Sequence, residues 1–261
     1  MNFDFNEEQT MIMDGIARYI REEYDFDRRR SIIESDSACS DDVWRQFSEL
    51  GWLSIPFDES YGGFGGHADD LAGVMLELGK GLIIEPYMST VVVFGSLLNA
   101  SNNDSLKEQL IPRIINGQYK GSFAYAEEQS RFEISDVKTS AQKCGDGYKL
   151  NGTKIAVIDA KESDGLIVTA RTGGSQYGAE GISLFLVDTS TEGVAVSSYN
   201  TMDSHSSSTI NLENVFVTEA NLIVDEGEGF RHIESCLPQI LLCLSAEALG
   251  IMEVLNKLTV E

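Results

Sequence analysis

The chain has 261 residues, 42% of them apolar and 23% charged, which is typical of a globular protein with room for two domains and part of a third. Its 42 acidic residues against 19 lysines and arginines give a net charge of −23, which argues against nucleic-acid binding and anionic membrane surfaces. No apolar run approaches the ~20 residues that span a bilayer, and the acidic N-terminus lacks the basic start of a signal peptide. We therefore expect a cytoplasmic protein without a membrane span.

The cysteines and histidines do not form a recognisable chemical site. None of the four cysteines belongs to a CxxC pair, and the three histidines show no metal-ligand spacing. The chain also lacks a GxSxG elbow for a nucleophilic serine. We expect reduced thiols and no metal site. These residues are Cys39, Cys144, Cys236, Cys243, His67, His205 and His232.

Residues 1–118 have the pattern of an all-helical N-terminal domain. Asn6 is a good N-cap, and Gln9 three residues later completes a capping box. Ser40 caps a later helix, and Gly51 is placed to end it in a left-handed conformation. The glycine-rich loop 56–66 lacks the Lys-Ser/Thr ending of a phosphate loop and is interpreted as a connector. The expected helices cover residues 6–24, 40–50, 68–79, 86–99 and 105–116, with a short turn at 28–34.

Residues 119–227 change to short β-rich segments separated by turn residues. Turns are expected at Gly145–Gly147 and again at Asn151–Gly152, and the serine-rich segment 202–208 is expected to be a mobile surface loop. The number of strands suits a barrel or two packed sheets. The expected strands are 123–126, 137–143, 148–151, 154–158, 165–171, 182–188, 194–199 and 209–217.

Residues 228–261 return to a strongly apolar helical pattern. Pro238 should kink or divide this helix, and small residues such as Gly250 permit close packing. A helix this apolar needs partners, so we expect further chain or another subunit to cover it. The sequence thus predicts an α+β protein with an all-α N-terminal domain, a β-barrel-like or two-sheet middle domain, and a truncated start of a C-terminal helical bundle.

This order of domains resembles the acyl-CoA dehydrogenase family, and the resemblance covers residues 5–261. Among subgroups the chain is most similar to the small chain of pimeloyl-CoA dehydrogenase, on the stretch Gly81–Tyr87. Five segments in the family's order carry the resemblance. They are the loop PFDESYGGFG at 56–65, ELGKG at 77–81, YKLNGTK at 148–154, GISLFLV at 181–187 and VFVTEANL at 215–222.

The resemblance implies FAD as cofactor, an acyl-CoA substrate, electron-transfer flavoprotein as electron acceptor, and a homo- or hetero-oligomer. The family's flavin-binding strands fall on 123–128 and 156–158, so Phe123, Tyr125, Ala126, Ala156, Val157 and Ile158 are the implied cofactor contacts. A serine near the thioester falls on Phe132, and an arginine near the substrate falls on Leu241. The catalytic glutamate falls beyond Glu261, so this chain contains no assignable base and is expected to be inactive alone.

Two departures leave a second hypothesis open. Ala126 stands where the family usually has threonine, and Ala156 replaces the tryptophan that covers one face of the flavin. The alternative is therefore a flavin-poor, non-catalytic subunit of a heteromeric complex. Glu127 and Glu128 are candidate substitute bases, but a strand-end turn is their expected role. A dicarboxylyl-CoA substrate is implied by the subgroup resemblance alone.

Overall fold

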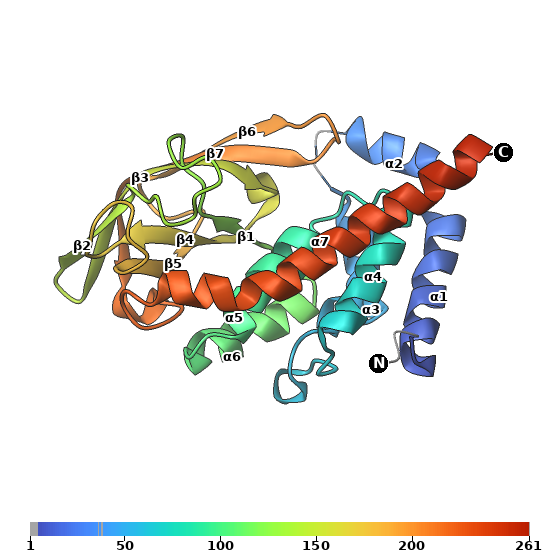
Figure 1. Cartoon of the computed structure of the whole chain (residues 1–261), viewed down its shortest axis with the longest axis horizontal. Coiled ribbons are helices and arrows are strands. Elements are labelled where there is room, and N and C mark those ends of the chain that lie inside the picture. The colour runs from blue at the N-terminus through green and yellow to red at the C-terminus, as the bar shows by residue number, and fades with distance from the viewer. Residues whose placement is uncertain (1–4, 36, 38, 261) are drawn as a thin grey trace.

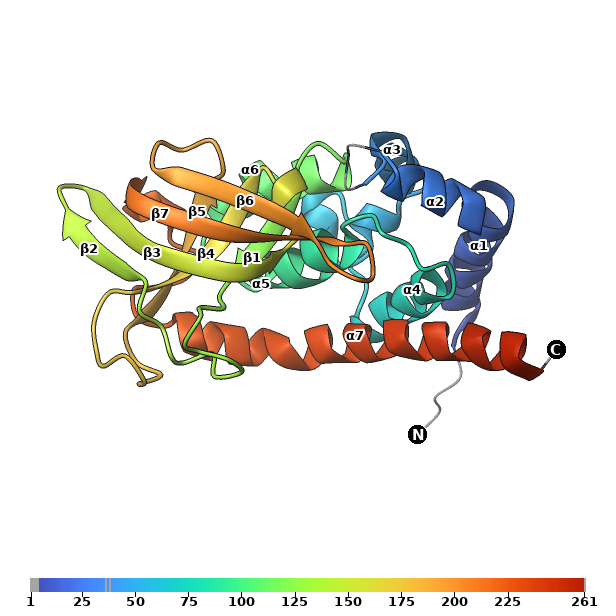
Figure 2. The ribbon, with the colours of Figure 1, turned by 90° about the horizontal axis from the view of Figure 1, so that it is seen from above.

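A computed structural model describes residues 5–35, 37 and 39–260, so the first four residues of the acidic N-terminus lie outside it. Helices at one end, a curled sheet at the other and one long helix running beside both make up the molecule (Figures 1 and 2). This arrangement confirms the expected α+β fold class. The long helix, α7 (Gly229–Val260), lies against both the sheet end and the helical end.

The N-terminal helices begin and end largely where the capping residues predict. Asn6 and Gln9 form the expected capping box on α1. Ser40 caps α3, and Gly51 adopts φ 79° after that helix. The elements are α1 (Glu7–Glu23), α2 (Phe26–Ile33), α3 (Asp41–Glu49), α4 (Ala68–Lys80), α5 (Gly95–Asn99) and α6 (Asp104–Ile115), with short 3₁₀ turns η1 (Trp52–Ser54) and η2 (Glu59–Tyr61).

The helix expected at 86–99 is not a regular α-helix. Its first part is a π-helical segment, η3 (Tyr87–Phe94), which continues directly into α5. π-helical segments are uncommon and are frequently found at functional sites. Here η3 runs beside β1 (Gly121–Ala124), where the hydroxyl of Thr90 donates to the carbonyl of Gly121 at 3.1 Å.

The strands form one seven-stranded sheet. Its order is β1-β4-β2-β3-β7-β6, and β5 pairs with β4. β1 and β4 are parallel, whereas β2 with β3, β3 with β7, β6 with β7 and β4 with β5 are antiparallel. The remaining bounds are β2 (Ser140–Cys144), β3 (Gly147–Ile158), β4 (Gly165–Arg171), β5 (Ile182–Asp188), β6 (Val194–Asn200) and β7 (Ser206–Thr218), with 3₁₀ turns η4 (Ala160–Glu162) and η5 (Glu219–Asn221).

The expected turn at Asn151–Gly152 is wrong. Both segments around it belong to β3, which pairs with β7 on either side of an irregularity between Leu150 and Gly152. The Asn151 side chain accepts a hydrogen bond from the backbone N–H of Asn214 at 2.8 Å and so bridges the irregularity. An Asn-Gly pair here makes a bulge, because the long partner strand continues past it.

The serine-rich segment is a surface loop only in its first part, where Met202 and Asp203 are exposed between β6 and β7. Its last three residues, Ser206–Ser208, begin β7 and are buried, with at most 3% of each side chain exposed. Ser207 and Ser208 pair with Ile158 and Val157 of β3. Strand pairing therefore places polar side chains in the interior, which composition alone does not indicate.

Two buried clusters form the core. The larger gathers the side chains of the N-terminal helices and also includes Ile167, Leu184 and Leu186 from the sheet. The smaller lies within the sheet and includes Tyr148, Phe185 and Val215. One face of the sheet thus shares its core with the helices, which fixes the strands relative to α4 and η3.

Helix α7 is continuous through Pro238, so the proline does not divide it. Pro238 lies on the exposed side, where water can satisfy the carbonyl that it leaves free. On the other side α7 touches α4 closely. A Cβ on Gly250 would lie 2.0 Å from the carbonyl oxygen of Leu76, and one on Gly79 would lie 2.3 Å from that of Glu247.

Length and composition alone would let α7 cross a membrane. Buried helices of soluble proteins share these properties, and α7 packs against α4, so the absence of a membrane span stays our prediction. The side of α7 that faces away from α4 is apolar and exposed. Its exposed side chains include Leu241, Leu249, Met252, Leu255 and Leu258.

Candidate functional site

A cavity of about 580 Å³ lies where the helices, the sheet and α7 meet. The chain segment 82–88 and α4 form one wall, the ends of β3, β6 and β7 form another, and α7 closes the third. Most of the lining surface is apolar. The apolar lining residues include Met75, Leu78, Leu82, Met88, Leu244 and Ile251.

Three residues of the predicted cofactor platform line this cavity, namely Tyr125, Ala156 and Ile158. The end of β1 and a bulge in β3 hold them together, because the N–H of Ile155 donates to the carbonyl of Ala126 at 2.9 Å. Ala156 adopts φ 51°, in the left-handed region. The platform is therefore a fixed apolar ledge formed by two strand ends.

The other predicted site residues lie around or away from the platform. Phe123 stacks on Tyr125, with ring centroids 5.1 Å apart and planes inclined by 24°. The side chain of Val157 is buried in the sheet core. Phe132 is fully exposed and Leu241 is 54% exposed on α7, and neither lines the cavity.

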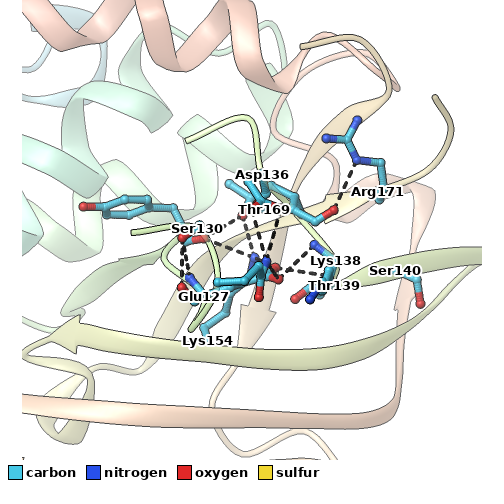
Figure 3. Close-up of polar contacts among 12 residues, drawn as sticks. Glu127, Ser130, Asp136, Lys138, Thr139, Ser140, Lys154, Thr169 and Arg171 are labelled. Carbon is cyan, nitrogen blue, oxygen red and sulfur yellow. Dashed lines mark hydrogen bonds and ion pairs between the residues drawn. The ribbon is translucent and has the colours of Figure 1, made fainter. Parts of the chain in front are cut away.

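Beneath the platform lies a buried ion pair between Lys154 of β3 and Glu127 (Figure 3). The two side chains are 0% and 4% exposed, and their Nζ and Oε1 atoms are 2.7 Å apart. The ammonium also donates to the hydroxyl of Thr169 at 2.7 Å and to the carbonyl of Tyr125 at 3.3 Å. The pair thus ties the end of β1 to β3 and β4.

Glu127 also organises the loop that follows β1. Its carboxylate accepts from the backbone N–H groups of Lys138 and Thr139, at 2.8 and 3.0 Å, and from the Gln129 side chain at 2.9 Å. Burial acts to raise the pKa of Glu127, but the Lys154 charge and these hydrogen bonds outweigh it and hold the pKa at about 2. Burial also lowers the pKa of Lys154 to about 8, so both groups are charged at neutral pH.

This position refines the expected role of Glu127. The residue does begin a turn, since the N–H of Ser130 donates to its carbonyl at 3.0 Å. However, its side chain is the buried counter-ion of Lys154, which the expectation of a simple strand-end turn did not include. Glu128 is exposed, as expected for a turn residue.

The cavity has a polar end opposite its apolar walls. Asp159 accepts from the hydroxyl of Ser89 at 2.6 Å and lies 3.7 Å from Nδ1 of His205. Glu85, which is 3% exposed, accepts from the N–H of Ser40 at 3.3 Å through Oε1. All of these except Ser40 and Ser89 line the cavity, together with Ser206, Ser207, Asp203, Glu247 and Arg29.

Burial shapes the charges at this end. Burial raises the pKa of Glu85 and that of Glu247. It acts to lower the pKa of His205, but Asp159 and Asp203 outweigh burial and raise that pKa above its ordinary value. The polar end therefore combines a histidine that protonates readily with carboxyl groups that resist ionisation.

Sequence reasoning missed this polar end. Glu85 is a single acid within the apolar run Leu82–Tyr87, which is an unusual place for a charge in a buried segment. No comparable signal marks His205 and Ser206, because they lie in a stretch that reads as a polar loop. The described residues contain no cluster of three or more histidine, cysteine or acidic side chains that would hold a metal ion.

Family comparisons match two parts of the chain. Residues 6–118 match the model of the acyl-CoA dehydrogenase N-terminal domain, and residues 122–215 match that of the acyl-CoA dehydrogenase middle domain. A probable acyl-CoA dehydrogenase of Bacillus subtilis, YngJ, is 30% identical over 258 residues. That alignment covers 97% of this chain and 67% of the relative, so the chain spans about two thirds of the relative's length.

Solved structures give the same result. A chain in the structure of the electron transferring flavoprotein of Acidaminococcus fermentans is 28% identical with a TM-score of 0.86, and the match covers 97% of this chain and 67% of that chain. The FAD complex of PigA has a TM-score of 0.90 at 24% identity, with 100% and 69% covered, and shows the likeness of fold.

Proposed function

Because this chain belongs to the acyl-CoA dehydrogenase family, we propose that it forms the FAD- and substrate-binding part of an enzyme that introduces an α,β double bond into an acyl-CoA thioester. The observation that carries this proposal is the cavity whose ledge is made by the predicted flavin-contact residues Tyr125, Ala156 and Ile158. A partly open, mainly apolar space beside a fixed ledge suits a flat ring and an acyl chain.

The residues at the ledge fit a flavin ring. Ala156 and Ile158 present little polar surface, and Ile158 leaves 57% of its side chain uncovered for a ligand to contact. Tyr125 adds an aromatic edge that Phe123 supports from behind. FAD, when bound, supplies the hydride acceptor. The chain's own residues orient the ring, and the apolar walls exclude water.

We also propose that the 261-residue chain by itself carries no base for this reaction. Glu127, the residue after the β1 end that the sequence offered as a substitute base, is held in a buried ion pair with a pKa of about 2. A general base works best when its pKa lies near the working pH, so a carboxylate with this pKa is a poor proton acceptor. The base then comes from chain or a subunit outside these residues.

A second function is favoured by the small side chains at the platform. Ala126 and Ala156 offer neither a hydroxyl to the flavin nor an aromatic cover, which would reduce the affinity for FAD. A chain that binds acyl-CoA but holds FAD weakly would act as a non-catalytic subunit. FAD affinity therefore separates the two functions.

The test is titration of the purified chain with FAD, followed by flavin fluorescence. We expect saturable binding in the wild type and about tenfold weaker binding in Tyr125→Ala, which removes the aromatic edge of the ledge. Tyr177→Ala is the matched control, because Tyr177 is 71% exposed and does not line the cavity. Absence of FAD binding in the wild type would favour the non-catalytic subunit.

Three further properties belong to the same proposal. We propose that the protein is cytoplasmic, that it passes electrons to an electron-transfer flavoprotein, and that it assembles into a homo- or hetero-oligomer. The exposed apolar side of α7 supports assembly, since such a surface is unfavourable in water. Light scattering coupled to size exclusion measures the oligomeric state directly.

A further inference from the structure

The polar end of the cavity contains side-chain atoms that nothing in the described residues satisfies. Among those residues, five buried side-chain nitrogen or oxygen atoms have no hydrogen-bond partner, and three of the five belong to residues that line this cavity. They are Glu85 Oε2, His205 Nδ1 and Ser206 Oγ. Nδ1 of His205 faces Asp159 Oδ1 at 3.7 Å, whereas the two oxygens face no partner among the described residues. Buried polar groups are nearly always paired, so these two oxygens at one cavity indicate a ligand group that pairs with them.

We infer that this cavity, taken as the acyl-binding site of the proposed function, selects thioesters whose acyl chain carries a protonated amine, which pairs with Glu85 at the polar end. Glu85 is the central residue, because it is 3% exposed and its free oxygen can only accept a hydrogen bond when ionised. An ammonium group donates up to three hydrogen bonds and carries the opposite charge.

The charges that line the polar end favour a cation. Four carboxyl groups line the cavity, against one guanidinium and one imidazole. Both cationic side chains are already engaged, since Arg29 donates to the carbonyls of Leu82 and Asp203 and His205 lies beside Asp159. Glu85, Asp203 and Glu247 form no ion pair within the described residues, but the Asp203 carboxylate accepts from the hydroxyl of Thr201 and the N–H of His205. That leaves Glu85 and Glu247 as the carboxyl groups that a ligand cation can neutralise.

The same features disfavour two other acyl groups. A plain hydrocarbon chain would leave Glu85 and Ser206 unpaired after displacing water, which is costly for buried polar groups. A terminal carboxylate would bring a fifth carboxyl group to a cavity that four already line, and it would offer no donor to Glu85 Oε2, which opposes the dicarboxylyl substrate that the subgroup resemblance implies. The ammonium is the group that relieves both problems.

The test compares matched acyl thioesters. ω-Aminoacyl-CoA esters of increasing length are titrated into the wild-type chain by calorimetry, beside straight-chain, ω-hydroxyacyl and ω-carboxyacyl esters of the nearest length. We expect the best ω-aminoacyl ester to bind about tenfold more tightly than its straight-chain match, as for a hydrogen bond to a charged group. Equal or tighter binding of the straight-chain or ω-carboxyacyl esters overturns the inference.

Two variants test the assignment to Glu85. Glu85→Gln should reduce the preference for the amine to less than about threefold, whereas Glu234→Gln, an exposed position on α7 outside the cavity, should leave it unchanged. Ser206→Ala gives a second measurement if Glu85→Gln fails to fold, and it should also lower the preference. An unchanged preference in the folded variants overturns the role of these residues.

A parallel series of N-acetylcysteamine thioesters separates this inference from the proposed function. These probes carry the same acyl groups without the CoA portion. An amine preference in this series, together with no binding of any CoA ester, contradicts CoA as the carrier and supports the polar end as an amine site. Absence of the preference in both series overturns the inference even if CoA esters bind.

Discussion

Two buried polar clusters lie close to the same ledge, and they differ in how completely they are satisfied. The Glu127 carboxylate accepts four hydrogen bonds, two on each oxygen, and its charge is matched by Lys154. Glu85 at the cavity has one oxygen without a partner in the described residues and no ion pair there. We call the Glu127–Lys154 group the closed cluster, because every oxygen and the charge have partners, and it has the features of a structural element. We call the polar groups around Glu85 the open cluster, and it has the features of a binding site.

The largest expected effect comes from breaking the closed cluster. Lys154→Met leaves the Glu127 charge buried without a counter-ion and should lower the free energy of unfolding by about 3–5 kcal/mol. Lys149→Met is the matched control on the exposed face of the same strand and should change it by less than about 0.5 kcal/mol. Urea unfolding measures both, and similar values for the two variants would contradict a structural role for the pair.

The second-largest effect is expected at low pH, where the closed cluster should contribute less to the free energy of unfolding. The pKa of Glu127 is lowered from 4.5 to about 2 on folding, so its contribution to stability is complete above pH 4.5 and is lost as the pH falls to about 2. The contribution is on the order of 3 kcal/mol. The difference in unfolding free energy between the wild type and Glu127→Gln should therefore shrink over this range, as followed by urea unfolding at each pH. A difference that stays constant there would show that the carboxylate is not stabilised by its partners.

The smallest effect on the free energy of unfolding is expected for a substitution in the open cluster. Glu85→Gln keeps an acceptor for the N–H of Ser40 and removes a charge that burial disfavours, so the free energy of unfolding should change by less than about 1 kcal/mol in either direction. The same substitution at Glu127 should cost about 1.5–3 kcal/mol, because it weakens hydrogen bonds to a charged group. Equal losses at both positions would remove the distinction between the clusters.

Much of the fold follows from local signals in the sequence. The capping box at Asn6 and the glycine at 51 set helix ends by hydrogen bonds within a few residues, so the helical region was predicted closely. The sequence does not predict the bulge at Asn151–Gly152, because the same dipeptide makes a turn or a bulge according to the strand that pairs with it. For Pro238 only the expected division of the helix is wrong, since the helix continues through the proline on its exposed side.

Local motifs likewise predict one part of the candidate site, and contacts between distant segments decide the rest. The motif order indicated the platform at Tyr125 and Ala156, and the structure places both at one cavity. The partner of Glu127 was not predicted, because Lys154 lies 27 positions away and meets it through strand pairing. Glu85 and His205 are farther apart still, on segments that approach each other in the folded chain.

The sequence by itself determined the helix–sheet–helix order, the family and the segments that form the ledge, because periodicity, caps and motifs are local. The tertiary structure decided which polar groups are closed and which are open. That distinction depends on the partners that a buried carboxylate meets from distant segments, and on whether they supply every hydrogen bond it needs.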